Sequence, residues 1–178
     1  MGSLNEEVIN CVNNLKDEDF SLRQKYLQRV AEGNLTRDEN PVTHFCVYFF
    51  PFNPVTKQVF LVHHKKANKW IPPGGHINKG ENLWQTLNRE IFEELGVRGY
   101  FKEQPIPFLL TITPINQSFT CKEHFDIWFL LKTNGTDFQI NAEEFYNTGW
   151  FNWAGAKKIV VDDATIKALS HIGSFFER

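Results

Sequence analysis

Three glutamates, Glu90, Glu93 and Glu94, are the residues in this sequence whose spacing most clearly suggests chemistry. In a helix they would occupy positions i, i+3 and i+4, so their carboxylates would project from one flank. Like charges at this spacing weaken a helix by roughly 0.2–0.5 kcal/mol per pair. One interpretation is a solvated acidic face. The other is a divalent cation, because Mg²⁺ takes oxygen ligands from one or two carboxylates and from substrate phosphates.

The residues around the glutamates predict the helix that must position them. Asn82 is a good N-cap, and Gln85 stands three residues later, where a capping-box partner is expected. Gly96 is the left-handed residue expected to end the helix. An apolar stripe runs between these signals at spacings of three and four residues, and it consists of Leu83, Trp84, Leu87, Ile91 and Leu95.

A longer pattern includes this helix. Residues 75–97 fit G-x5-E-x7-R-E-U-x-E-E-x-G-U, where U is aliphatic, at every fixed position. Those positions are Gly75, Glu81, Arg89, Glu90, Ile91, Glu93, Glu94, Gly96 and Val97. The segment resembles the Nudix box, the signature of hydrolases that cleave a diphosphate linked to another group. It assigns no subfamily. The resemblance extends from about His44 onward and implies an α+β fold, an α/β/α sandwich around a mixed β-sheet.

The resemblance also implies a metal site and a set of catalytic residues. Glu90, Glu93 and Glu94 are the expected ligands of Mg²⁺, with Mn²⁺ as a substitute, and the carbonyl of Gly75 is a fourth. Arg89 lies one turn before Glu93 and can hold that carboxylate as an ion pair. We expect Glu93, Glu94 and Arg89 to act in catalysis, while Glu81 orients the loop.

A second acidic segment completes the expected site. Residues 141–153 resemble the family's acidic loop followed by a Trp-Phe strand. Some relatives place a further metal ligand or base in that loop, and Glu144 is the candidate here, with Glu143 as the reserve. The general base is either Glu93 or Glu144.

The implied reaction is Mg²⁺-dependent hydrolysis of a diphosphate linkage in a nucleoside diphosphate derivative. The substrate could be a nucleotide sugar, a dinucleotide or a nucleoside triphosphate. The alternative is a module that binds or senses nucleotide metabolites without cleaving them. Such modules commonly lose box glutamates, and every one is present here, so the sequence favours the enzyme.

Four residues are candidates for substrate binding. Lys65 belongs to a basic loop that either contacts phosphate or simply increases solubility. Trp70 could stack on a base, as could Phe119 or Trp128. His124 and Asp126 alternate with apolar residues in a predicted strand and so share one face. That face would be either a substrate pocket or an exposed sheet surface.

The cysteines raise the question of a zinc site. Cys11, Cys46 and Cys121 are too few and too scattered for a disulfide framework. His44 and Cys46 stand two residues apart, and Cys121 and His124 stand three apart. Structural zinc sites favour ligands on tight turns, whereas both pairs fall in strand-like stretches. We therefore expect ordinary buried thiols.

Composition and net charge indicate which partners and which location to expect. The chain has 178 residues and a net charge of −2, which gives no global basic field that would attract nucleic acid or an anionic membrane. The apolar runs are too short to cross a bilayer. We expect a cytoplasmic protein whose partner is a small-molecule nucleotide, with a homodimer possible.

The predicted helices and strands divide the chain into two parts. Residues 1–33 predict two helices within an N-terminal helical extension over residues 1–40, whose apolar stripes serve packing or dimerisation. Residues 41–178 form the expected Nudix domain. Its predicted strands cover residues 44–50, 58–63, 108–113 and 123–132, with a turn at Pro51–Pro54. A short and a longer helix, the latter capped by Asp162 or Asp163, end the chain.

Overall fold

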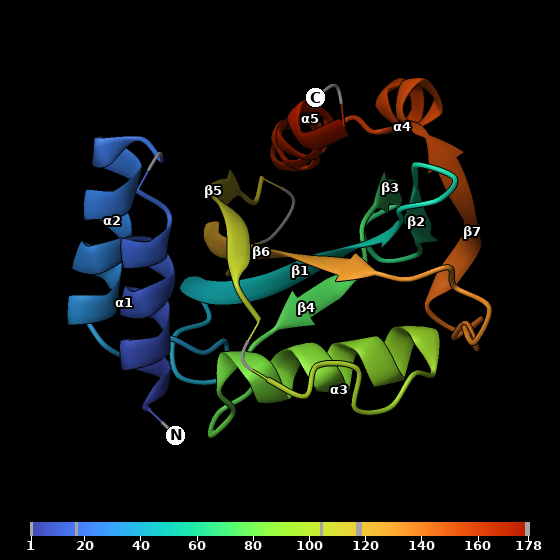
Figure 1. Cartoon of the computed structure of the whole chain (residues 1–178). Helices are drawn as coiled ribbons and strands as arrows, with labels where there is room; N and C mark the ends of the chain where they lie inside the picture. Colours follow the sequence, from blue (N-terminus) through green and yellow to red (C-terminus); the bar gives the residue numbers. More distant parts are fainter. Residues whose placement is uncertain (1, 17, 104, 117–118, 177–178) are drawn as a thin grey trace.

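A computed structural model describes residues 2–16, 18–103, 105–116 and 119–176. Along the described residues, helices stand at both ends, and α3 interrupts the strands between them (Figure 1). They are α1 (Leu4–Asn14), α2 (Phe20–Ala31), β1 (Thr43–Asn53), β2 (Gln58–His64), β3 (Lys69–Ile71), β4 (Gly74–His76), α3 (Leu83–Leu95), β5 (Pro107–Pro114), β6 (Glu123–Lys132), β7 (Phe145–Asn152), α4 (Trp153–Ile159) and α5 (Asp163–Phe176).

One mixed sheet organises the chain. Its strand order is β3-β2-β1-β6-β5, with β4 paired to β1 and β7 paired to β2. The pairing of β1 with β6 is parallel, and the other pairings are antiparallel. One edge of β1 is divided: β2 pairs with its end at Phe52 and Asn53, whereas β4 pairs with Cys46, Val47 and Tyr48. The short strand β4 is therefore held directly against the centre of the sheet.

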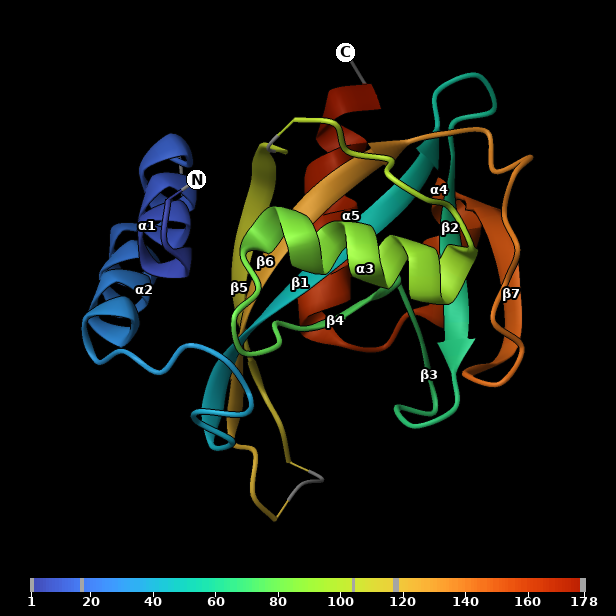
Figure 2. The ribbon, with the colours of Figure 1, turned by 90° about the horizontal axis from the view of Figure 1, so that it is seen from below.

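Helices cover both faces of the sheet. In Figure 1, α3 lies below the sheet, and α4 and α5 lie above it. The pair α1 and α2 stands to one side, and Figure 2 places it beside the β5 edge. This confirms the predicted α/β/α sandwich around a mixed sheet, with helices at the N-terminus.

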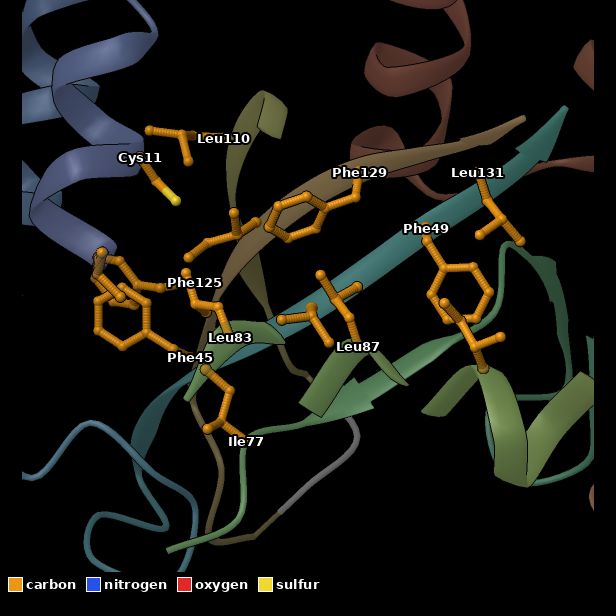
Figure 3. Close-up of a cluster of buried hydrophobic side chains, with 14 of the residues drawn as sticks. Cys11, Phe45, Phe49, Ile77, Leu83, Leu87, Leu110, Phe125, Phe129 and Leu131 are labelled. Atoms are coloured by element: carbon orange, nitrogen blue, oxygen red, sulfur yellow. The ribbon is translucent and has the colours of Figure 1, made fainter. Parts of the chain in front are cut away.

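The N-terminal helices share the hydrophobic core with α3. Val8, Val12 and Tyr26 are fully buried in the same cluster as Leu87 and Phe45. Figure 3 shows Cys11 of α1 facing this cluster, together with side chains from α3, β1 and β6. The apolar stripes of these helices thus pack inside the chain itself. The dimer and the division between residues 40 and 41 stay predictions.

The predicted strands and helices are present, with one error in the connection between β1 and β2. Pro51 was expected in the turn, but it lies within β1, opposite Leu131 of β6. The turn covers residues 54–57. Proline lacks a donor N–H, and β1 tolerates it because its pairing with β2 begins only at Phe52. Among the described residues, no helix is long and apolar enough to cross a membrane.

Candidate active site

The acidic helix forms as the sequence predicts. The side chain of Asn82 accepts a hydrogen bond from the N–H of Gln85, and the Gln85 side chain accepts one from the N–H of Asn82, over 2.9 and 3.0 Å. Gly96 ends the helix at φ 73°, a conformation that glycine adopts without steric cost. The apolar face of α3 packs on the sheet, so its acidic flank is fixed beside β4.

Glu94 is the most deeply buried of the three glutamates on α3. Its side chain accepts a hydrogen bond from the N–H of Gly74 over 2.8 Å, and the residue is only 2% exposed. Among the described residues, no basic side chain pairs with it. Burial raises the pKa of Glu94 well above its ordinary value, and the nearby Glu90 carboxylate raises it further. A buried ionised carboxylate without a cationic partner is costly, and either a proton or a bound cation can offset that cost.

Glu90 lies directly against the glycine that begins the box. A Cβ atom placed on Gly75 would lie 2.3 Å from Oε1 of Glu90, so only glycine allows this approach. Burial raises the pKa of Glu90 to about 7, although Arg89 opposes the shift. Glu90 therefore stands beside the backbone of β4, where the carbonyl of Gly75 was expected to join the ligand set.

Arg89 connects several of these groups. It donates from Nε to Oε1 of Glu81 over 2.7 Å and from Nη1 to Glu90 and Glu93 over 2.8 and 2.9 Å. The predicted ion pair with Glu93 is therefore present. Its Nη2 also donates to the carbonyl of His76 over 2.9 Å. Glu93 differs from the other two glutamates because its side chain is 48% exposed.

The acidic loop before β7 reaches the same place. Glu144, Glu94 and His64 each offer one ligand atom, and these atoms lie within 4.8 Å of one another. Lys65 holds the loop from β2: its N–H donates to the carbonyl of Glu144, and its Nζ donates to the carbonyl of Ala142, both over 2.9 Å. The structure thus brings Glu144 to the box glutamates.

His64 is a site residue that sequence reasoning missed. The sequence predicts no role for it, because its pairing with Phe145 in β7 could not be seen in the sequence. Its Nδ1 accepts a hydrogen bond from the N–H of Lys66 over 3.1 Å, which places the proton of the neutral ring on Nε2. Burial lowers the pKa of His64, so the neutral form is favoured. In that form Nε2 carries the proton, so this nitrogen can donate a hydrogen bond but does not offer a lone pair to a metal.

Two of the proposed substrate contacts are corrected by the structure. Asp126 is 1% exposed, and its Oδ2 accepts hydrogen bonds from the hydroxyls of Thr111 and Thr113. Trp128 is also 1% exposed, and its Nε1 donates to Thr111 Oγ1 over 2.8 Å. Strand alternation correctly predicted that Asp126 and His124 lie on the same face of β6. It could not show that Asp126 is buried there and bonded to side chains of β5. Neither side chain is accessible to a substrate.

The other substrate candidates lie in four different places. Lys65 supports the acidic loop, as described above. Trp70 is partly exposed and stacks on His63, with ring centroids 5.3 Å apart. Phe119 is fully exposed in the connection before β6. His124 is half-buried and packs against His44 and His76, away from the glutamates.

A cavity of about 530 Å³ lies between the start of α2, strand β5 and the start of α5. None of the box glutamates lines it, and neither does Glu144. Its polar lining includes Lys25, Lys69 and Lys167. The carboxylate group and this cavity are therefore separate features of the surface.

The residues around Glu94 suit a hard divalent cation. Carboxylate oxygens from Glu90, Glu94 and Glu144 supply the ligand type that Mg²⁺ prefers. The close approach of Glu90 to Gly75 leaves no room for a side chain there. Two of these carboxylates are buried with raised pKa values, so a cation would relieve both their repulsion and their desolvation.

Comparison with known proteins decides the family. The sequence model of the NUDIX domain matches residues 40–169, which is most of the chain. The chain belongs to the NUDIX domain family. The match begins just before β1 and ends within α5, so it contains α3, the acidic loop and the whole sheet.

Two curated relatives are similar over part of this Nudix chain. Nudix hydrolase 6 of Arabidopsis thaliana is 32% identical over 120 residues, which cover 65% of this chain and 40% of that protein. The m7GpppN-mRNA hydrolase NUDT17 of Xenopus laevis is 31% identical over 126 residues, which cover 60% and 40%. The chain thus spans about 40% of the length of these relatives.

Solved structures agree on the fold. The MutT NUDIX hydrolase from Burkholderia pseudomallei superposes with a TM-score of 0.61 at 18% identity, covering 73% of this chain and 98% of that one. At this identity the likeness concerns the fold alone.

Proposed function

We propose that this Nudix chain is a Mg²⁺-dependent hydrolase that cleaves a diphosphate linkage in a nucleoside diphosphate derivative. The observation that carries the proposal is the position of Glu94. Its carboxylate is buried, has no basic partner among the described residues, and lies within 4.8 Å of a ligand atom of Glu144. Such an arrangement is costly by itself and becomes favourable when a cation binds.

The proposed ligands are Glu90, Glu93 and Glu94, with the Gly75 carbonyl. When bound, Mg²⁺ would neutralise phosphate oxygens and lower the pKa of a coordinated water. Glu90 and Glu94 are the better placed carboxylates, because both are buried beside β4. Glu93 is held by Arg89 and is half-exposed, so it faces the outer side of the group. Arg89 acts by positioning, since it fixes Glu81, Glu90 and Glu93 at once.

For the general base we propose Glu144. The base accepts the proton of the attacking water as oxygen bonds to phosphorus, and the leaving phosphate departs with the electrons of the broken P–O bond. Glu144 is not engaged in an ion pair among the described residues, whereas Glu93 is bound to Arg89. His64 can hold Glu144 in place by donating from Nε2.

The substrate class is proposed from the family, because the 530 Å³ cavity is separate from the carboxylates. Similarity to an mRNA-cap hydrolase shows that some relatives act on large capped molecules, so the expectation that nucleic acid is not a partner stays a prediction. Base stacking on Trp70 likewise stays a prediction.

A substrate panel tests the proposal. Nucleotide sugars, dinucleotides, nucleoside triphosphates and a cap dinucleotide are incubated with the full chain, with and without Mg²⁺ or Mn²⁺, and products are separated by chromatography. We expect a nucleoside monophosphate or diphosphate to appear only with metal. Nucleotide binding by calorimetry without any turnover across the panel would instead support the non-catalytic binding module.

The organisation of the chain is also a proposal. We propose residues 1–40 as the helical extension and residues 41–178 as the Nudix domain, which the start of the family match at residue 40 supports. A cytoplasmic location and a homodimer are proposed from the sequence alone.

A further inference from the structure

A second group of metal-ligating side chains lies on the opposite face of the sheet from α3. His44, Cys46, His76 and His124 each offer one ligand atom, and these atoms all lie within 4.8 Å of one another. The sequence predicts an ordinary buried thiol at Cys46, whereas the structure places ligand atoms of three histidines beside it. None of the four belongs to the proposed Mg²⁺ site.

Sheet register explains why the four side chains meet. His44 is directly opposite His124 in the parallel pair of β1 and β6, and Cys46 is directly opposite His76 in the antiparallel pair of β1 and β4. Directly opposite residues have Cβ atoms about 4.5–5.5 Å apart, and residues two apart in a strand share a face. Three strands therefore present one ligand set. The neighbouring Phe45 instead faces the core under α3.

His44 is already arranged as a ligand. Its Nδ1 lies 3.1 Å from the carbonyl of Asn40, which can only accept, so Nδ1 carries the proton and Nε2 carries a free lone pair. That Nε2 is buried and has no hydrogen-bond partner among the described residues, in a side chain that is 1% exposed. A histidine whose Nδ1 donates to a backbone carbonyl is the usual arrangement around a protein-bound metal.

The other members complete a compact group. The ring centroid of His44 is 4.8 Å from those of both His76 and His124, and the latter two are 5.1 Å apart. Cys46 is 1% exposed, while His76 and His124 are half-buried and leave a side for entry. Ligand atoms around tetrahedral zinc lie roughly 3.3–3.8 Å apart, given bonds of about 2.0–2.3 Å, so a shift of about 1 Å closes the site.

The charges nearby also bear on a cation. Asp126 lies close enough to interact with Cys46, and its Oδ1 is a buried atom without a partner among the described residues. Arg37 opposes a cation, because it lies close enough to interact with all three histidines. The thiolate that metal binding creates at Cys46 offsets the charge of Arg37.

We infer that His44, Cys46, His76 and His124 form a structural site for Zn²⁺, separate from the proposed catalytic cation. Three imidazoles and one thiolate favour zinc over Mg²⁺, which prefers oxygen ligands. On binding, the Cys46 thiol loses its proton to solvent and its sulfur bonds to the metal. The site would fix β4, whose His76 carbonyl accepts from Arg89 on the other face. Zinc would thereby hold the strand that carries Gly75.

Metal analysis and cobalt spectroscopy test this inference. The full chain, purified without chelator, is analysed for bound metals. After chelator treatment, one equivalent of Co²⁺ is added, because tetrahedral cobalt with a thiolate ligand shows a sulfur-to-cobalt charge-transfer band that an all-oxygen site cannot give. We expect stoichiometric zinc, the charge-transfer band, and a higher Tm when Zn²⁺ is added to the metal-free protein.

Variants separate this site from other thiols and from the carboxylates. Cys46→Ala and His44→Gln should lose zinc and the sulfur band, whereas Cys11→Ala should keep both. The band should remain in Glu94→Gln, because Glu94 is not one of the four proposed zinc ligands. Loss of the zinc site can therefore be distinguished from loss of the proposed Mg²⁺ site. Circular dichroism establishes that each variant is folded. The inference is overturned if the wild-type chain shows no sulfur band, if the band survives Cys46→Ala, or if a metal other than zinc copurifies stoichiometrically.

Discussion

The carboxylate of Glu7 in α1 accepts a hydrogen bond from the backbone N–H of Leu83, the first residue of α3, over 2.9 Å. Both residues are buried. The first N–H groups of a helix have no hydrogen-bond partner within the helix. A negative charge near them also interacts favourably with the positive end of the helix dipole. The N-terminal extension thus contributes directly to the start of the helix that carries the proposed metal ligands.

Replacing Glu7 should therefore destabilise the chain. Glu7→Ala leaves the N–H of Leu83 buried without its acceptor, which costs about 1–3 kcal/mol in free energy of unfolding. Glu7→Gln retains an acceptor oxygen and should lose less. Urea denaturation of the two variants beside wild type measures this. Equal losses in Glu7→Ala and Glu7→Gln would show that the hydrogen bond is not what stabilises this contact.

Glu7 should also make stability depend on pH. Burial raises the pKa of Glu7 in the folded chain, although the bond from Leu83 opposes the shift. Because the folded pKa exceeds the unfolded value of about 4.3, folding is favoured most below that value. The contribution is lost as pH rises through the folded pKa. The stability of wild type relative to Glu7→Gln should therefore fall from about pH 4 upward. A difference that grows with pH in favour of wild type would contradict this.

Arg89→Lys should weaken both the fold and the site. Arg89 binds Glu81 through two hydrogen bonds, of 2.7 and 2.9 Å, which a lysine cannot reproduce. We expect a loss of about 1–3 kcal/mol in stability and a higher Mg²⁺ requirement for turnover. Arg98→Lys is the matched control, because Arg98 lies over the Phe92 ring and forms no ion pair among the described residues. Equal effects of the two substitutions would argue against a positioning role for Arg89.

Glu144→Gln should reduce kcat by about 10²–10⁴-fold, the usual contribution of a general base. Glu143→Gln is its control, because that neighbouring side chain is exposed and lies outside the group formed by Glu94, Glu144 and His64. Steady-state kinetics at saturating Mg²⁺ provide the comparison. An unaffected kcat in Glu144→Gln would shift the role of base to Glu93.

Local signals in the sequence predicted α3 completely. The cap at Asn82, the partner Gln85 and the end at Gly96 depend on residues within one helix, so their pattern is visible without the fold. The Nudix box is likewise continuous in sequence. Its ligands on α3 could therefore be proposed from residues 75–97 alone.

Features that depend on strand pairing could not be read in the same way. The pairing of β4 with β1 is set by three residues of each strand, and it alone brings His76 to Cys46. His64 joins the site through the pairing of β2 with β7. Alternation predicted which face of β6 carries Asp126. The partners of Asp126 on that face, Thr111 and Thr113, belong to another strand and could not be predicted from the alternation.

The central claim is that Glu94 is buried to hold a catalytic cation. Gln at this position can still accept the hydrogen bond from Gly74, so the fold should be retained while the charge is lost. The decisive measurement is Mg²⁺-dependent turnover of the substrate found in the panel by wild type, Glu94→Gln and the exposed control Glu103→Gln. We predict a loss of about 10²-fold or more in kcat for Glu94→Gln alone, with unchanged circular dichroism. Turnover by Glu94→Gln equal to that of wild type, at the same Mg²⁺ concentration, would contradict the account.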